Sequence, residues 1–270
     1  MSVSKILIAS LILVVSSASF AQSTPAPKDT SSENPRAIMP ERPTVATHAF
    51  TVSPAYLEIE TGLERDQFDP RNTGLGIPTV FKIGIADRAQ LSINAPFTKP
   101  PGISAGVGDL SVGIKYRLVD DAPLVGAFAV LPSIKAPTGD ENSGRGTGTT
   151  DFSVLAISSH KFGDYSMDLN VGYTHRSNGS SPSSATLWTA SFGGPVAGKF
   201  GWTAECYGYP GTGGPFGQAP IVAVLAGPTL LAVETLAFDA GVIIPVKGPQ
   251  PHAIYAGLVY NVGRIFPSGK

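Results

Sequence analysis

A strict alternation of apolar and polar residues across residues 109–118 constrains this chain more than any other feature. The apolar set is Leu110, Val112, Ile114, Tyr116 and Leu118, and the polar or small set is Asp109, Ser111, Gly113, Lys115 and Arg117. Successive side chains of a β-strand point to opposite faces, so this period of two predicts an amphipathic strand. Residues 165–174 repeat the pattern, which argues against a typical helical enzyme.

Twelve segments after residue 50 are predicted strands, most of them nine to eleven residues long, the length of a tilted strand that crosses a bilayer. They are residues 55–64, 75–85, 90–97, 109–118, 124–134, 151–159, 165–174, 186–192, 202–209, 220–228, 236–244 and 254–262. The two faces are harder to separate at residues 124–134, 151–159, 186–192, 202–209 and 220–228 than in the other seven segments. We therefore predict an all-β fold, a transmembrane up-and-down antiparallel β-barrel of about 12 strands.

The connections between these segments alternate between long and short. The long ones are residues 66–74, 98–106, 136–150, 176–185, 210–219 and 246–251, and the short ones are 86–88, 119–123, 162–164, 195–199 and 229–235. Short periplasmic turns, long external loops and an even number of strands are typical of outer-membrane barrels. A soluble β-sandwich has the same period, but only 14% of the residues are charged, and large apolar residues stand opposite the charges.

The positive charges on the strands predict which face is turned toward lipid. A Lys or Arg on the lipid face near the midplane costs roughly 2 to 4 kcal/mol, and an open sheet edge in lipid leaves backbone groups without partners. The sheet should therefore close, with its basic side chains inside. The residues expected to point to the lumen on this ground are Lys82, Lys115, Arg117 and Lys135.

The first 48 residues are predicted to be an export signal followed by a linker. Lys5, an apolar stretch over residues 6–15 and a small-x-small site ending at Ala21 predict a cleaved signal peptide over residues 1–21. About twenty apolar residues are needed for a spanning helix, so a membrane anchor is disfavoured. Residues 22–48 are rich in Pro, Ser and Thr and predict a flexible periplasmic extension, with a partner-binding Pro-rich motif as the alternative. The barrel domain is then residues 49–270, in the cell outer membrane.

Composition and motif searches exclude several classes of function. A net charge of −1 lacks the basic footprint of a nucleic-acid binder. The single Cys206 excludes a disulfide framework and a multi-thiolate metal site. Gly-x-Ser-x-Gly, phosphate-loop and His-Glu-x-x-His motifs are missing from the sequence. We therefore expect no metal and no cofactor.

Several short motifs, in this order and spacing, resemble those of one known family. They are Gly-Val-Gly-Asp-Leu-Ser-Val-Gly-Ile-Lys-Tyr-Arg-Leu at 106–118, Lys-Ala-Pro-Thr-Gly-Asp at 135–140, the Gly-rich residues 144–150, Asp151-Phe152, Ala204-Glu205 and Asp-Ala-Gly-Val at 239–242. From about residue 50 onward the chain resembles the outer-membrane transporter family named for the meta pathway of phenol degradation. The resemblance implies an outer-membrane barrel that passes small hydrophobic or aromatic compounds, and it brings no catalytic residues. The partners expected for such a protein are outer-membrane lipid, a small hydrophobic or aromatic solute and the barrel-assembly machinery.

Charged residues on the polar face are the candidate site within that family. They would either line a narrow substrate path or form a salt-bridged network that closes it, because opposite charges can pair across a barrel this narrow. These lumen-facing candidates are Glu58, Glu60, Lys82, Asp109, Lys115, Arg117, Asp168, Glu205 and Asp239.

One constellation could instead carry chemistry. His175-Arg-Ser177-Asn178-Gly179 resembles a motif of outer-membrane phospholipase A, another twelve-stranded barrel. The match would make His175 the general base and Ser177 the nucleophile of a lipid esterase on the lipid side of the barrel. Thr189 stands where that enzyme has the Asn that orients its histidine. A non-enzymatic transporter is the favoured interpretation, and a structural or adhesive barrel is the third.

Overall fold

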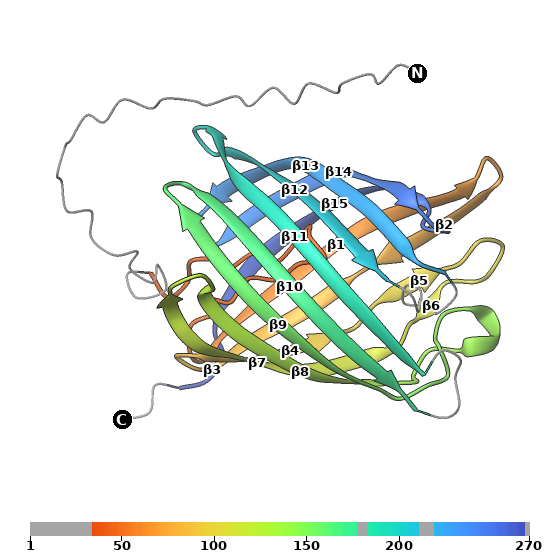
Figure 1. The fold of residues 1–270 in the computed structure, drawn as a ribbon, viewed down its shortest axis with the longest axis horizontal. Helices are drawn as coiled ribbons and strands as arrows, with labels where there is room; N and C mark the ends of the chain where they lie inside the picture. Colours follow the sequence, from red (N-terminus) through yellow and green to blue (C-terminus); the bar gives the residue numbers. More distant parts are fainter. Residues whose placement is uncertain (1–33, 178–182, 211–218, 268–270) are drawn as a thin grey trace, which may run out of the picture.

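Strands dominate the computed structural model, which describes residues 34–177, 183–210 and 219–267 (Figure 1). Within these residues twelve long antiparallel strands follow one another around a sheet that closes where β15 pairs with β1. The wall strands are β1 (Tyr56–Asp69), β3 (Thr79–Ala86), β4 (Ala89–Asn94), β7 (Leu110–Ala122), β8 (Gly126–Ala136), β9 (Asp151–Phe162), β10 (Tyr165–Arg176), β11 (Ser184–Ala197), β12 (Phe200–Tyr209), β13 (Ile221–Val233), β14 (Leu236–Lys247) and β15 (His252–Arg264). The predicted twelve-stranded up-and-down barrel is confirmed.

Three short strands extend the wall at the end with the long loops. They are β2 (Asn72–Ile77), β5 (Phe97–Lys99) and β6 (Gly106–Val107). The predicted loop at residues 66–74 is wrong, because β1 continues to Asp69 and pairs with β2 in a hairpin. The predicted strand at residues 75–85 is likewise divided between β2 and β3. The end of β1 toward the long loops forms its backbone hydrogen bonds with β2. The part of β1 nearer the short turns pairs with β3.

The two ends of the barrel differ in the length of their connections. The short turns are residues 87–88, 123–125, 163–164, 198–199 and 234–235. They lie at the left end of the barrel in Figure 1, together with the end of β15. Gly163 and Gly198, in two of these turns, have φ values of 64° and 56°, a left-handed conformation that favours glycine. In outer-membrane barrels the short-turn end faces the periplasm. Two predicted turns, at 119–123 and 229–235, are in fact occupied mainly by longer strands.

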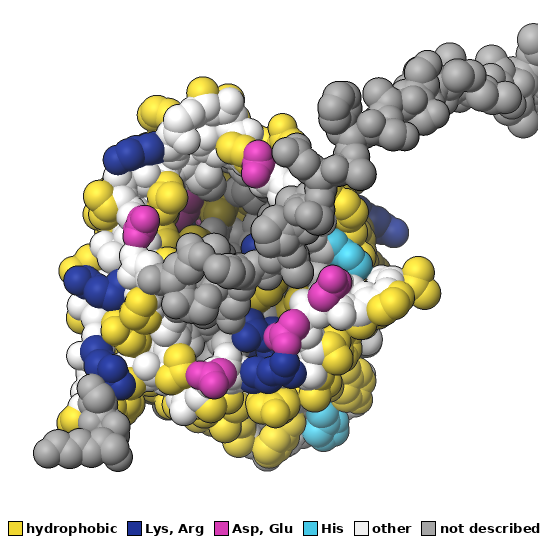
Figure 2. Space-filling view, turned by 90° about the vertical axis from the view of Figure 1, so that its left-hand side faces the viewer, with side chains coloured by type: hydrophobic (Ala, Val, Ile, Leu, Met, Phe, Trp, Pro, Cys, Tyr) yellow, Lys and Arg dark blue, Asp and Glu magenta, His cyan; other side chains and the backbone are white. Residues whose placement is uncertain are grey.

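The two faces of each strand meet different surroundings. On β7, Val112, Ile114 and Tyr116 are exposed on the outer surface, whereas Lys115 and Arg117 are buried inside. Figure 2 looks onto the short-turn end and shows apolar side chains around the outer surface, with charged side chains mainly on the rim. An apolar exterior around a polar interior is the arrangement that lipid requires. Among the described residues, no helix is long and apolar enough to cross a membrane.

A segment that precedes β1 occupies the lumen. Residues 34–55, which we call the N-terminal plug, begin near the β13–β14 turn, where the Ile38 N–H donates to Glu234 O at 2.9 Å. They end at the same end of the barrel, where the Ala55 N–H donates to Gly84 O at 2.7 Å. Between these points Ala46 and Ala49 are buried. The plug is therefore a loop that enters the lumen from the short-turn end and returns to it.

This placement corrects the expectation of a flexible extension over residues 22–48. Residues 34–48 are held inside the barrel because charged and amide side chains of the wall bond to their backbone. Residues 22–33 and the predicted signal peptide at 1–21 lie outside the described residues. The barrel wall itself begins at Tyr56, so residues 49–55 belong to the plug and not to the first strand.

Candidate functional site

Two glutamates of β1 hold the first part of the plug. Glu58 accepts a hydrogen bond from the Met39 N–H at 2.8 Å. Glu60 accepts two, from the N–H groups of Glu41 at 2.8 Å and Arg42 at 3.0 Å. Both carboxylates are inward-facing and buried. A buried carboxylate needs such donors, because burial without partners costs several kcal/mol.

Polar side chains on the opposite wall hold the middle of the plug. Glu205 on β12 accepts from the Val45 N–H at 2.8 Å and from the Ala46 N–H at 2.7 Å. Asn170 on β10 accepts from the Thr47 N–H at 2.8 Å and donates to Thr47 O at 2.9 Å. The plug thus crosses the lumen from β1 to β12 and β10, and its backbone is bonded to the wall on both sides.

Two buried lysines complete this network. Lys82 forms ion pairs with Glu58 at 2.7 Å and Glu60 at 2.6 Å. Lys115 pairs with Glu41 of the plug and also donates to His48 O at 2.9 Å. Removing one partner of a buried ion pair costs about 3–5 kcal/mol. The lysines therefore stabilise the plug and the charges of the wall together.

The ionisation of two plug residues follows from these contacts. Burial alone would raise the pKa of Glu41, but the charges of Lys115 and Lys82 hold that pKa well below its usual range. Burial, assisted by the positive charge of Lys115, lowers the pKa of His48 to about 3. At neutral pH the plug therefore presents an ionised Glu41 and an uncharged His48 to the wall.

Arg42 fixes the plug at the junction where the sheet closes. Its guanidinium donates to both carboxylate oxygens of Asp239 on β14, at 3.0 and 3.2 Å. The guanidinium lies against Gly62 of β1 and Gly257 of β15, where an added Cβ would come within 2.6 and 2.4 Å of it. A side chain at either position would displace the guanidinium, so glycine is what lets Arg42 lie against the wall here.

The remaining lumenal candidates also have partners. Arg117 pairs with Asp120 at 2.9 Å and donates to Asp87 O at 3.2 Å. Asp168 accepts from the Ser159 hydroxyl at 2.5 Å, and Ser159 in turn accepts from the N–H of Ala49 in the plug at 2.8 Å. Each of these charged side chains thus has a polar partner in the wall or in the adjoining turns.

Asp109 lies apart from the plug, directly before β7, where residues of the long loop between β8 and β9 bond to it. It accepts from Lys135 Nζ at 2.7 Å and from the N–H groups of Gly139 at 3.0 Å and Thr147 at 2.9 Å. Although partial burial opposes it, Lys135 and these N–H groups hold the pKa of Asp109 below its usual range. The three motif segments at 106–118, 135–140 and 144–150 therefore meet at one carboxylate, whose role in this structure is to hold the loop.

Sequence reasoning missed the plug and therefore missed Glu41, Arg42 and Asn170. The register of the strands contains one signal for the plug. Glu205 lies opposite Ser191 and Leu225 on its neighbouring strands, without a basic residue beside it. A buried carboxylate without a cross-strand cation needs a donor from outside the wall. Register was needed to see this, because the sequence does not state which residues of adjacent strands lie opposite each other.

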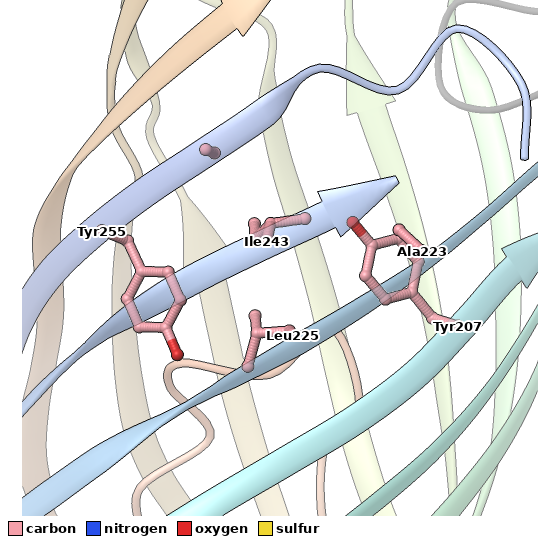
Figure 3. Close-up of a cluster of buried hydrophobic side chains, with 6 residues drawn as sticks. Tyr207, Ala223, Leu225, Ile243 and Tyr255 are labelled. Atoms are coloured by element: carbon pink, nitrogen blue, oxygen red, sulfur yellow. The ribbon is translucent and has the colours of Figure 1, made fainter. Parts of the chain in front are cut away.

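A cluster of apolar side chains lies on the inner wall of β12–β15, in the half of the barrel toward the long loops. Tyr207 lies opposite Ala223 in the sheet, and Leu225 lies opposite Ile243. Figure 3 shows the rings of Tyr207 and Tyr255 on either side of Leu225 and Ile243. The buried members of the cluster are Tyr207, Ala223, Leu225, Ile243, Ala253 and Tyr255. Because barrel interiors are usually polar, this apolar wall needs an explanation.

A second apolar group lies on β8 and β9. It joins Ala127, Ala129 and Ile157 of the wall to Ala49 of the plug. The partly buried hydrophobic side chains packed against it are Phe50, Leu131 and Leu155. The inner wall therefore has apolar side chains on two sides, and those of β8 and β9 pack against the plug.

Two residues of the esterase alternative are described by the structure, His175 near the end of β10 and Ser177 just beyond that strand. His175 is exposed. The Ser177 hydroxyl donates to Thr150 O at 2.7 Å. Asn178 and Gly179 lie outside the described residues. Within the described parts of the chain, no group of three or more His, Cys, Asp or Glu side chains could hold a metal ion.

Comparisons with solved structures support the barrel architecture. The COG4313 outer membrane channel from Pseudomonas putida F1 superposes with a TM-score of 0.60 at 12% identity, over 79% of this chain and 97% of that one. The KdgM porin in complex with disordered oligogalacturonate gives a TM-score of 0.50 at 12% identity, over 75% and 98%. At such low identity these likenesses show the fold alone, an outer-membrane barrel. No curated protein matches this chain.

A family model matches residues 41–250, from the plug residue Glu41 to the β14–β15 loop. The match includes the three motif segments that meet at Asp109 and the wall strands from β1 through β14. Together with the closed barrel and its likeness to an outer-membrane channel, it confirms the family that the sequence motifs resemble. The chain belongs to the family described as "Putative MetA-pathway of phenol degradation", and it is an outer-membrane channel-like barrel.

Proposed function

We propose that this barrel passes small hydrophobic or aromatic compounds across the outer membrane through its lumen. The observation that carries the proposal is the apolar inner wall formed by Tyr207, Leu225, Ile243 and Tyr255. Water and ions gain little from contact with its aliphatic side chains. An apolar solute, by contrast, gains free energy in proportion to the apolar area it removes from water.

The position of the wall fits entry from the side of the long loops. Ala253 is the second residue of β15, and Ala223 is the third residue of β13, so both lie close to the long connections. The N-terminal plug lies beyond them, in the half toward the short turns. A compound that enters from outside reaches the apolar wall first, and its further passage requires the hydrogen bonds of the plug to open.

The test is uptake of radiolabelled toluene by a strain that lacks the gene and carries a variant on a plasmid. Leu225→Glu should reduce the initial rate about fivefold relative to wild type, because a charge on the apolar wall must be desolvated when an apolar solute passes. Leu225→Met is the matched control, since it retains apolar character and nearly the same volume. It should take up toluene at the wild-type rate.

Equal uptake by cells with wild-type protein and cells with empty plasmid would overturn the proposal. So would a Leu225→Glu variant that reaches the outer membrane in normal amount and transports toluene as fast as wild type. Heat-modifiable gel mobility of each variant establishes that the barrel has folded before rates are compared.

A further inference from the structure

One row of residues at the closure of the sheet forms a bare surface that ends in a carboxylate. Gly62 of β1 lies directly opposite Gly257 of β15, and Gly257 lies directly opposite Asp239 of β14. A Cβ at either glycine would meet the guanidinium of Arg42, and Asp239 accepts hydrogen bonds from the same group, so the row faces the lumen. The wall therefore presents two backbone segments without side chains beside one buried carboxylate.

The guanidinium of Arg42 matches this row in shape and in charge. Its Nη2 and Nε donate to the two carboxylate oxygens of Asp239, at 3.0 and 3.2 Å. Such a two-pronged bond needs a planar fork of N–H groups, which arginine has and lysine lacks. At position 257 the three atoms nearest to an added Cβ all belong to Arg42, at 2.4 to 2.6 Å. The guanidinium thus accounts for the missing side chain at Gly257.

The lysines that hold the plug are bound in a different way. Lys82 forms ion pairs with Glu58 at 2.7 Å and Glu60 at 2.6 Å. Lys115 pairs with Glu41 of the plug. A lysine ammonium is a compact charge that a carboxylate can approach from many directions. The row at the closure of the sheet is therefore suited to a guanidinium group, and not to positive charge in general.

The side chain of Arg42 itself fills the space in front of the row. It is 12% exposed, and the side chain of Asp239 beneath it is 5% exposed. If the Arg42 side chain is removed, its volume becomes free, and Asp239 becomes a buried carboxylate without its cation. Such a carboxylate is unfavourable, so the vacated space favours a ligand of the same shape and charge.

We propose that Gly62, Gly257 and Asp239 form a binding site for alkylguanidinium compounds, which Arg42 occupies as a tethered ligand while the plug is in place. A free compound of this class takes the position of the Arg42 guanidinium, with two N–H groups on the carboxylate of Asp239. When the plug leaves, the opened lumen retains solutes that end in a guanidinium group in preference to primary amines. The site is independent of the proposed function, because the plug and the wall define it whichever solute passes.

Removing the Arg42 side chain from the full-length protein tests the site, with methylguanidinium as the probe. The probe is titrated into Arg42→Ala in nanodiscs of deuterated lipid and followed by broadening of its methyl proton signal, with empty nanodiscs as the correction. Arg42→Ala should bind methylguanidinium about tenfold more tightly than methylammonium, the ratio that one further hydrogen bond to a charged group provides. Wild type should bind methylguanidinium about tenfold more weakly than Arg42→Ala, because Arg42 fills the site.

Two further variants show where the probe binds. Adding Asp239→Asn to Arg42→Ala should abolish the preference for methylguanidinium. Arg36→Ala is the matched control, since it removes another plug guanidinium, one that donates to Asn261 O at 3.3 Å, and it should bind the probe as weakly as wild type. The proposal is overturned if Arg42→Ala binds the two cations equally, if wild type binds methylguanidinium as tightly as Arg42→Ala, or if the preference survives Asp239→Asn.

Thermal unfolding gives a second readout. A ligand that binds only the folded state stabilises that state, so methylguanidinium should raise the unfolding temperature of Arg42→Ala more than methylammonium does. If Arg42→Ala folds only in part, the yield of heat-modifiable barrel after refolding is measured instead. Methylguanidinium should restore that yield, and equal yields with the two cations would contradict the site.

Discussion

Deleting residues 38–50 should raise the single-channel conductance of the barrel severalfold in a planar lipid bilayer. These residues carry the plug across the lumen, where Glu60, Glu205 and Asn170 hold their backbone. Without them, water and ions fill the space, and the charged groups of the wall become hydrated. The barrel should remain folded, because the sheet is closed by β1 and β15 independently of the plug.

A matched control deletes residues 24–32, which precede the plug. That variant keeps every plug contact described above and should conduct like wild type. Heat-modifiable mobility of both variants checks that the barrel has formed. If removal of residues 38–50 from a folded barrel leaves its conductance at the wild-type level, the plug does not restrict the lumen.

Reversing the charge of Lys115 should release the plug without shortening the chain. Lys115→Glu places a carboxylate beside the carboxylate of Glu41 and beside His48 O, where the ammonium now forms an ion pair and a hydrogen bond. Loss of a buried partner costs about 3–5 kcal/mol, and hydration of an opened lumen relieves part of that cost. We expect conductance well above wild type and a lower temperature of thermal unfolding.

Lys199→Glu is the control for this change, since it makes the same charge reversal at the exposed β11–β12 turn. It should alter neither conductance nor thermal stability by more than a small fraction of the Lys115→Glu effect. An open-channel current for Lys115→Glu equal to that of wild type would mean that this lysine does not hold the plug in the lumen.

The wall of the barrel could be predicted from the sequence because lipid and lumen impose a period of two. On β7 the alternation identified the exposed side, with Ile114 and Tyr116, and the buried side, with Lys115. The predicted ends of the strands agreed less well with the structure. The hairpin of β1 and β2 projects beyond the other strands, where neither lipid nor packing enforces a strict alternation.

The plug could not be predicted in this way, because no periodic pattern in its own residues fixes its conformation. Its prolines exclude a regular strand, and its bonds run from irregular backbone to side chains far along the chain, such as Val45 to Glu205. Composition therefore indicated a flexible linker. The apolar cluster was missed for a related reason: residues 220–228 are apolar on both faces, so periodicity did not separate the lumenal Leu225 from its outward neighbours.

The most direct test of the account is to locate the solute inside the barrel. Intact cells are incubated with a diazirine-bearing toluene analogue and illuminated, and the labelled residues of the purified protein are mapped by mass spectrometry. Adducts are expected on Tyr207, Leu225 and Ile243, and they should disappear in the presence of excess toluene. Labelling confined to the lipid-facing surface, at residues such as Phe238, with none on the inner wall, would contradict the proposed function.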